Sequence, residues 1–224
     1  AATRAAILAG VEWEILRGLD DVDRRAVLAR AVRRRYRAGN NLFHQGDPGD
    51  SLHLLDRGHV AVQVVDRRGT TLTLDVLGPG SAFGEQSLLE PGARRTAGAA
   101  AIGPVETLVL EGDAFAELQA RHPSVTWVLV ELLAAQLRRL SERLLDAHTL
   151  PADDRVRKQL RRLADTFADG AGADLPITQQ DLAALAGTTR PTANRALQPL
   201  LDAGVVALGR GRIVVTDRAA LAQL

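Results

Sequence analysis

The chain has 224 residues, enough for one or two domains of ordinary size. Hydrophobic residues make up 46% and charged residues 25%, which is the composition of a globular protein with a sizeable core. The 28 basic and 27 acidic side chains nearly cancel, which excludes a uniformly basic coat or an acidic tail but leaves room for a local basic face. There is no cysteine, which excludes disulfides, a thiolate nucleophile, an iron–sulfur cluster and cysteine-ligated haem or zinc.

The sequence also lacks the motifs typical of membrane proteins, secreted proteins, metal-binding proteins and enzymes. No apolar run approaches the roughly 18 residues of a membrane helix, and the first residues do not resemble a signal peptide. The five histidines have no metal-ligand spacing, so no metal site is expected. Paired catalytic carboxylates, a nucleophile elbow and a Walker loop are also missing, so no catalytic residues are expected. We therefore expect a cytoplasmic protein that is not an enzyme and does not contact membranes.

Residues 5–35 predict short helices. Apolar residues recur at helical spacing between Ile7 and Leu19. Asp20 or Asp21 can cap a second helix that carries Val22 and Val27. We interpret the three arginines at 33–35 as a solvated helix end, which is the usual meaning of a charge run.

The pattern changes between Tyr36 and about Leu110. Frequent glycines separate short runs with β-branched residues and partial alternation, such as 60–65 and 70–77. This pattern predicts many short strands in an all-β barrel or roll. Residues 66–69 predict a hairpin turn.

Helical spacing returns after Glu111. The sequence predicts a short helix over 113–121 and, opened by Pro123, a long helix over 124–148. Its leucine stripe fits a coiled-coil seam, but an amphipathic helix packed on its own domain would look the same. A further helix is expected over 155–168 and a loop over 170–174. We divide the chain into domains at 1–112, 113–150 and 151–224.

Residues 177–203 predict a helix-turn-helix. Thr178 can cap a first helix with Asp181 completing a capping box, and Gly187 can end that helix. Thr188 or Thr189 then caps a second helix with Pro191 in its first turn.

The second helix carries side chains suited to the major groove of DNA. Arginine can bond guanine through two hydrogen bonds, and asparagine can bond adenine. Residues 205–215 then predict a hairpin wing with a Gly-Arg-Gly-Arg turn. Residues 187–215 hold four arginines against one aspartate, a local charge of +3. We expect DNA contacts from Thr178, Thr189, Arg190, Thr192, Asn194, Arg195, Arg210 and Arg212.

Two segments of the β-rich region resemble a known domain. Residues 37–62, with Gln-Gly-Asp and then an alternating strand, resemble the opening of the cyclic-nucleotide-binding β-roll. Residues 83–97 resemble its phosphate-binding cassette, with Gly84 and Glu85 followed ten residues later by Arg95, Thr96 and Ala97. With the long helix and the helix-turn-helix, the chain resembles the cAMP receptor protein and fumarate–nitrate reductase regulator (Crp/Fnr) family of bacterial transcription factors over essentially its whole length.

The resemblance implies an α+β fold: an N-terminal cyclic-nucleotide-binding β-roll (jelly-roll-like), a long dimerisation helix and a C-terminal winged helix-turn-helix. It also implies a ligand site. Arg95 and Thr96 would bind the cyclic phosphate, and Glu85 would accept from the ribose 2′-hydroxyl. A short helix near Ser87 would direct amide groups at the phosphate. Including the apolar walls and the helical lid, the implied ligand residues are Val62, Leu74, Gly84, Glu85, Ser87, Arg95, Thr96 and Ser141.

The sequence departs from the family at two places. The lid has adjacent hydroxyl residues in the family, but Leu140 stands beside Ser141 here, which favours weak cAMP binding or another cyclic nucleotide. Arg190 is followed by Pro191 where the best-known member has glutamate, so the preferred half-site should differ.

The resulting expectation is a homodimeric regulator that pairs through the helix at 124–148. It would bind cAMP or another cyclic nucleotide, such as cGMP, as its effector and use neither a metal nor an iron–sulfur cluster. It would read a palindromic operator in double-stranded DNA and contact RNA polymerase. The alternative is the same DNA-binding regulator with a non-functional or differently liganded effector pocket, controlled constitutively or by a partner.

Overall fold

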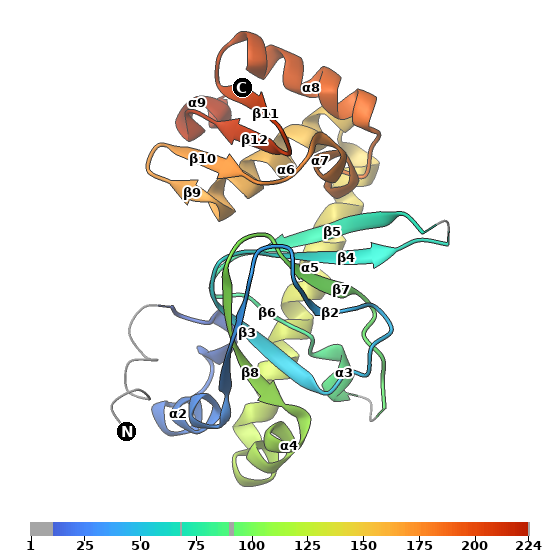
Figure 1. Ribbon diagram of the computed structural model, residues 1–224. Coiled ribbons are helices and arrows are strands. Elements are labelled where there is room, and N and C mark those ends of the chain that lie inside the picture. The colour runs from blue at the N-terminus through green and yellow to red at the C-terminus, as the bar shows by residue number, and fades with distance from the viewer. Residues whose placement is uncertain (1–10, 68, 90–91, 224) are drawn as a thin grey trace. The chain divides into compact units, whose positions relative to one another are not determined.

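The computed structural model describes residues 11–67, 69–89 and 92–223 (Figure 1). They form two compact units. Of the described residues, the first unit contains those of 11–64 and 77–138, and the second contains those of 65–76 and 139–223.

The first unit opens with helical elements. Asp20 caps α2 (Asp21–Arg30) by accepting from the backbone N–H groups of Val22 and Asp23, so the predicted helix is confirmed and Asp20 is the one of the two candidate caps that acts. Of the helix predicted before it, the described part contains only the short 3₁₀ turn η2 (Glu14–Leu16). Positions 5–10 of that prediction lie outside the described residues.

The predicted β-roll is confirmed as two four-stranded antiparallel sheets, ordered β1-β8-β3-β6 and β2-β7-β4-β5 (Figure 1). The strands are β1 (Val32–Tyr36), β2 (Asn41–Phe43), β3 (Ser51–Arg57), β4 (Val60–Val65), β5 (Thr71–Leu77), β6 (Ala82–Phe83), β7 (Gly98–Ala101) and β8 (Val105–Glu111). The helix α3 (Gln86–Leu89) follows β6. At the predicted hairpin turn, the Asp66 N–H donates to the Thr70 carbonyl at 3.0 Å.

The interpretation of residues 33–35 as a helix end is wrong, because they lie in β1. This strand pairs with β8 in antiparallel register, with Arg34 opposite Thr107. Arg33 forms ion pairs with Asp56 and Glu106, and Arg35 pairs with Glu106 at 3.0 Å. Ion pairs with carboxylates that are distant in sequence therefore neutralise these arginines on the edge strand. Charged side chains on an edge strand also discourage pairing with the strands of other chains.

Helices close one side of the first unit. α4 (Gly112–Arg121) follows β8 directly, and a turn, η3 (Pro123–Val125), leads into α5 (Thr126–Thr149). Leucines of β3 and β8 form one buried cluster with the apolar residues of α4 and the start of α5, among them Leu52, Leu110, Phe115, Val128 and Leu132. Farther along α5, the leucine stripe is solvent-exposed in the single chain, with Leu137 65% exposed.

The second unit contains the predicted helix-turn-helix and wing (Figure 1). Its helices from residue 152 onward are α6 (Ala152–Thr166), α7 (Gln179–Leu185), α8 (Arg190–Asp202) and α9 (Arg218–Gln223). Its strands β9 (Ala168–Asp169), β10 (Gly172–Leu175), β11 (Val206–Gly209) and β12 (Arg212–Val215) form a sheet ordered β11-β12-β10-β9. Leu160, Leu163, Leu182 and Leu197 are fully buried at the centre of the unit.

Two predictions for this unit need correction. α6 begins at Ala152 rather than 155, so Asp153 and Asp154 lie in its first turn. Residues 170–174 are not a loop: β9 and β10 form a hairpin that turns at Gly170, and β10 pairs with the wing strand β12. Ala173 and Leu175 are buried while Asp174 is exposed, an alternation too short for the sequence to reveal.

No helix in the described part of the chain is long and apolar enough to cross a membrane. The described residues also include no group of three or more histidine or acidic side chains arranged to hold a metal ion.

Candidate effector pocket and nucleic-acid interface

Arg95 is the buried cation of the cassette, and its side chain is held in one orientation. The side chain is only 4% exposed. Its Nη1 donates to the carbonyl oxygens of Ser51 at 2.9 Å and Gly84 at 2.7 Å, and its Nη2 donates to the Ser51 hydroxyl at 2.8 Å. The guanidinium carbon lies 4.2 Å from the ring centroid of Phe43, in cation–π geometry. The result is a fixed positive charge that would attract an anion such as a phosphate.

Gly84 makes this arrangement possible. Its φ of +88° is a conformation that glycine adopts without strain. A Cβ at this position would lie 2.7 Å from Arg95 Nη1 and 2.9 Å from the Ser51 carbonyl oxygen. The glycine is therefore required by both its backbone conformation and the close approach of Arg95.

Glu85 is the carboxylate of the cassette and is only 2% exposed. Its Oε1 accepts a hydrogen bond of 2.7 Å from Gln136 Nε2 on α5. Sequence reasoning missed Gln136. The sequence feature that could have identified Gln136 is its position one helical turn before Leu140, because this spacing places both residues on the same face of the helix.

The other predicted ligand residues lie in several elements. Thr96 is exposed, and its hydroxyl donates to Gln86 Oε1 of α3 at 2.7 Å. Ser87 belongs to α3, and Val62 is half-buried on β4. Leu74, which is exposed on β5, and Ser141, which is exposed on α5, belong to the second unit. Their membership of the effector pocket stays a prediction.

A neutral histidine, His53, shares the neighbours Ser51 and Phe43 with Arg95. His53 Nε2 is 3.5 Å from the Ser51 hydroxyl, and its ring stacks on Phe83 with centroids 5.1 Å apart. Burial, followed by the charges of Arg95 and Arg34, lowers the pKa of His53 to about 3. The side chain therefore packs among Ser51, Phe43 and Phe83 near Arg95 without adding a second positive charge at neutral pH.

In the second unit, α7 and α8 form the helix-turn-helix with the predicted caps. The Thr178 hydroxyl accepts from the Asp181 N–H at 3.1 Å, and the Asp181 carboxylate accepts from the Thr178 N–H at 2.9 Å. The predicted capping box is therefore confirmed. Gly187 forms the turn with a φ of +60°.

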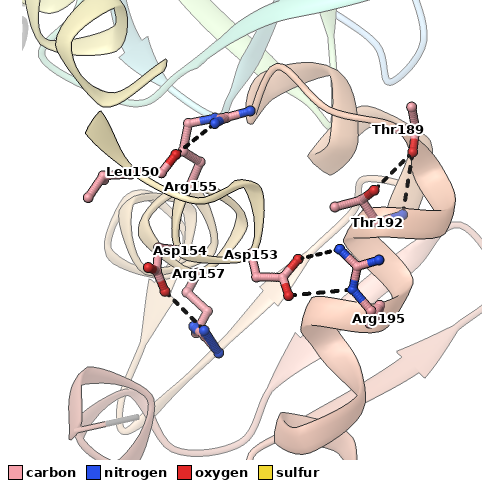
Figure 2. Close-up of polar contacts among 8 residues, drawn as sticks. All are labelled: Leu150, Asp153, Asp154, Arg155, Arg157, Thr189, Thr192 and Arg195. Atoms are coloured by element: carbon pink, nitrogen blue, oxygen red, sulfur yellow. Dashed lines mark hydrogen bonds and ion pairs between the residues drawn. The ribbon is translucent and has the colours of Figure 1, made fainter. Parts of the chain in front are cut away.

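Thr189, rather than Thr188, caps α8 (Figure 2). Its hydroxyl accepts from the Thr192 N–H at 3.5 Å and lies 3.1 Å from the Thr192 hydroxyl. Arg190 and Asn194 are exposed on the same helix. The apolar residues Ala193, Ala196 and Leu197 recur at helical spacing and are buried. The polar side chains between them are therefore on the solvent-exposed face of α8.

The wing also carries exposed cations. β11 and β12 are joined through Arg210 and Gly211, whose φ is +71°. Arg210 and Arg212 are both exposed, and Arg212 pairs with Asp174 at 3.3 Å.

Arg195 on α8 has a partner that the sequence did not reveal. Its Nη2 donates to Asp153 Oδ1 at 3.0 Å, and its Nε donates to Asp153 Oδ2 at 3.5 Å (Figure 2). The two residues are 42 positions apart and meet because α6 packs on α8.

The fold and these two sites define a cyclic-nucleotide-binding domain joined to a DNA-binding domain, and family comparisons agree. A model described as a cyclic nucleotide-binding domain matches residues 33–122, and one described as a Crp-like helix-turn-helix domain matches residues 132–224. The "Cyclic AMP receptor protein" of Thermus thermophilus is 38% identical over 192 residues, covering 86% of this chain and 87% of that protein. The "CRP-like cAMP-activated global transcriptional regulator" of Mycobacterium tuberculosis is 32% identical over 189 residues, covering 83% of this chain and 84% of that protein.

Solved structures are similar as well. The catabolite activator protein of T. thermophilus has a TM-score of 0.54 at 36% identity, covering 93% of this chain and 96% of that one. The c-di-GMP-responsive regulator CLP of Xanthomonas campestris shares the fold, with a TM-score of 0.71 at 22% identity and coverage of 88% and 99%. The chain belongs to the Crp/Fnr family of transcription factors, whose members are regulators rather than enzymes.

Proposed function

We propose that this regulator binds a cyclic nucleotide between Arg95 and Glu85 and couples that binding to operator recognition by α8. Its domains would divide at 1–112, 113–150 and 151–224. The observation that carries the proposal is the pair of buried, oppositely charged cassette side chains, each with a fixed set of hydrogen bonds. A cyclic phosphodiester supplies the anion that a guanidinium binds, and its ribose supplies the hydroxyl donor that a carboxylate accepts.

The relatives support a cyclic effector without selecting one. Regulators named for cAMP are more than 30% identical to this chain. The ligand residues would be Val62, Leu74, Gly84, Glu85, Ser87, Arg95, Thr96 and Ser141. The regulator would act in the cytoplasm and need no metal. Binding would shift the protein between weakly and strongly DNA-binding states, with a coupling of about 1–3 kcal/mol.

The DNA-binding half of the proposal uses the exposed polar face of α8 and the wing. Two chains would pair through the exposed leucines of α5 and present two recognition helices to a palindromic operator. The proposed contacts are Thr178, Thr189, Arg190, Thr192, Asn194, Arg195, Arg210 and Arg212. RNA polymerase would be the partner of the DNA-bound dimer.

Calorimetry and thermal unfolding with cAMP, cGMP and c-di-GMP test the effector. A ligand that binds only the folded state raises the melting temperature, and Arg95→Ala should abolish both the heat of binding and this rise. Because Arg95 is buried, the exposed Thr96→Ala is a second variant that should weaken binding without endangering the fold.

One observation favours the alternative that the pocket is non-functional or differently liganded. Gln136 already occupies an oxygen of Glu85, the group expected to accept from ribose. If no cyclic nucleotide changes the melting temperature while the protein selects specific DNA, this alternative replaces the proposal.

A further inference from the structure

The contact between Asp153 and Arg195 joins the first turn of α6 to the exposed face of α8 (Figure 2). The Arg195 side chain is 68% exposed and the Asp153 side chain 33%. Arg195 is therefore accessible to a ligand while it is held by a carboxylate of its own chain.

The geometry leaves one edge of the guanidinium available. Asp153 accepts from Nε at 3.5 Å and from one N–H of Nη2 at 3.0 Å. Nη1 and the second N–H of Nη2 form the other edge. Guanine presents O6 and N7 as two neighbouring acceptors in the major groove, and an arginine edge fits them with two hydrogen bonds. Arg195 can therefore bind Asp153 and a guanine at the same time.

The carboxylate also restricts an otherwise mobile side chain. An exposed arginine populates many rotamers, and ordering it on DNA costs conformational entropy. A partner that orders the side chain in advance reduces that cost. This restraint comes from α6, because Asp153 lies in the first turn of that helix.

We propose that Asp153 is a positioning residue that fixes Arg195 for end-on recognition of a guanine and so helps to set the base preference of the half-site. The inference rests on the proposed DNA-binding function and deepens it. Asp153 itself contacts no base in this scheme.

Asp154 provides a matched control. It lies beside Asp153 in the first turn of α6 and pairs with Arg157 of the same helix at 3.0 Å. Asp153→Ala and Asp154→Ala each remove one negative charge from the same helix N-terminus. Both changes should alter helix stability and phosphate attraction to a similar degree, but only the first should release Arg195.

The experiment uses the full-length protein and a pool of duplexes with a randomised core. The wild type selects a consensus, and affinity is then measured for the consensus and for every single base-pair substitution. Arg195→Ala identifies the base pair that Arg195 reads. At that position Asp153→Ala should lower discrimination by about three- to tenfold, while Asp154→Ala should not change it. Asp153→Glu retains a carboxylate and should recover part of the loss.

Two results would overturn the inference alone. One is full discrimination by Asp153→Ala at the position read by Arg195. The other is a larger gain in affinity for the consensus than for the substituted duplexes, which would mean that Asp153 withholds Arg195 from DNA. If the wild type selects no consensus at all, the proposed DNA-binding function falls, and this inference falls with it.

Discussion

Gln136 Nε2 donates a 2.7 Å hydrogen bond to Glu85 Oε1, so the amide of α5 satisfies the buried carboxylate of the cassette. A buried carboxylate without donors would be costly. We predict that a ribose hydroxyl takes the place of this amide on Glu85 and competes with it, although a carboxylate has acceptor sites for further donors. Ligand binding at Glu85 and the side-chain conformation of Gln136 are linked by this competition.

The first prediction concerns Gln136→Ala. Without its ligand, the variant should unfold about 1–3 kcal/mol more easily because Glu85 loses its donor. Its affinity for the cyclic nucleotide should rise about fivefold, since the ligand no longer displaces a hydrogen bond worth about 1 kcal/mol. Urea unfolding and calorimetry measure the two effects.

Glu131→Ala is the control for that experiment, because Glu131 is exposed on the same helix. It should change neither quantity appreciably. A lower nucleotide affinity in Gln136→Ala would show instead that Gln136 contacts the ligand, which would contradict the competition.

The cassette was predictable from sequence, but its partner on α5 was not. Gly84, Glu85 and Arg95 lie in a short pattern whose spacing encodes local geometry. Gln136 depends on which turn of α5 faces Glu85, and helical spacing alone leaves that open.

Two other features were missed for a similar reason. Arg33 lies in a strand that pairs with β8, and its carboxylate partners Asp56 and Glu106 are also distant in sequence. Asp153 reaches Arg195 through packing of two helices. Caps and turns, by contrast, depend on residues within one turn of each other, so the sequence predicted the cap Thr178 and narrowed the cap of α2 to Asp20 or Asp21.

The second prediction compares two glycines. Gly84→Ala forces a side chain into a positive φ and into contact with the Ser51 carbonyl and Arg95. Gly39 has a similar φ of +78°, but a Cβ there would meet nothing within 4 Å. Gly39→Ala should cost about 1–2 kcal/mol of unfolding free energy from backbone strain alone. Gly84→Ala should cost at least about 2 kcal/mol more and weaken nucleotide binding, because backbone atoms must move. Equal losses in urea unfolding would show that the close contact is unimportant.

The third prediction concerns His53 and pH. Its pKa is lowered to about 3 in the folded protein by burial, then by Arg95 and Arg34, from the ordinary histidine value of 6.5. Between these values the unfolded chain binds more protons than the native protein. The full free energy of unfolding is therefore retained above pH 6.5, where His53 is neutral in both states. It decreases as the pH falls from 6.5 toward 3, because protonation of His53 then favours the unfolded chain.

The test compares the wild type with His53→Phe, which keeps an aromatic ring beside Phe83. From pH about 7.5 to about 5, the wild type should lose about 2 kcal/mol more unfolding free energy than the variant. His148→Phe, at an exposed position, should retain the wild-type slope. Parallel slopes for His53→Phe and the wild type would mean that His53 does not stay neutral in the native state.

The fourth prediction concerns the exposed leucines of α5. Leu137, Leu140 and Leu144 are each at least 59% exposed in the single chain. An apolar stripe of this kind is stabilised when a second helix covers it. Leu137→Glu should therefore weaken the dimer at least tenfold, because a charge would be buried in an apolar interface. Sedimentation over a range of concentrations measures the dissociation constant.

Val22→Glu introduces the same charge at another exposed apolar position, on α2, and should leave the dimer intact. A wild-type chain that sediments as a monomer at high concentration, or an unchanged Leu137→Glu dimer, would show that α5 is not the interface.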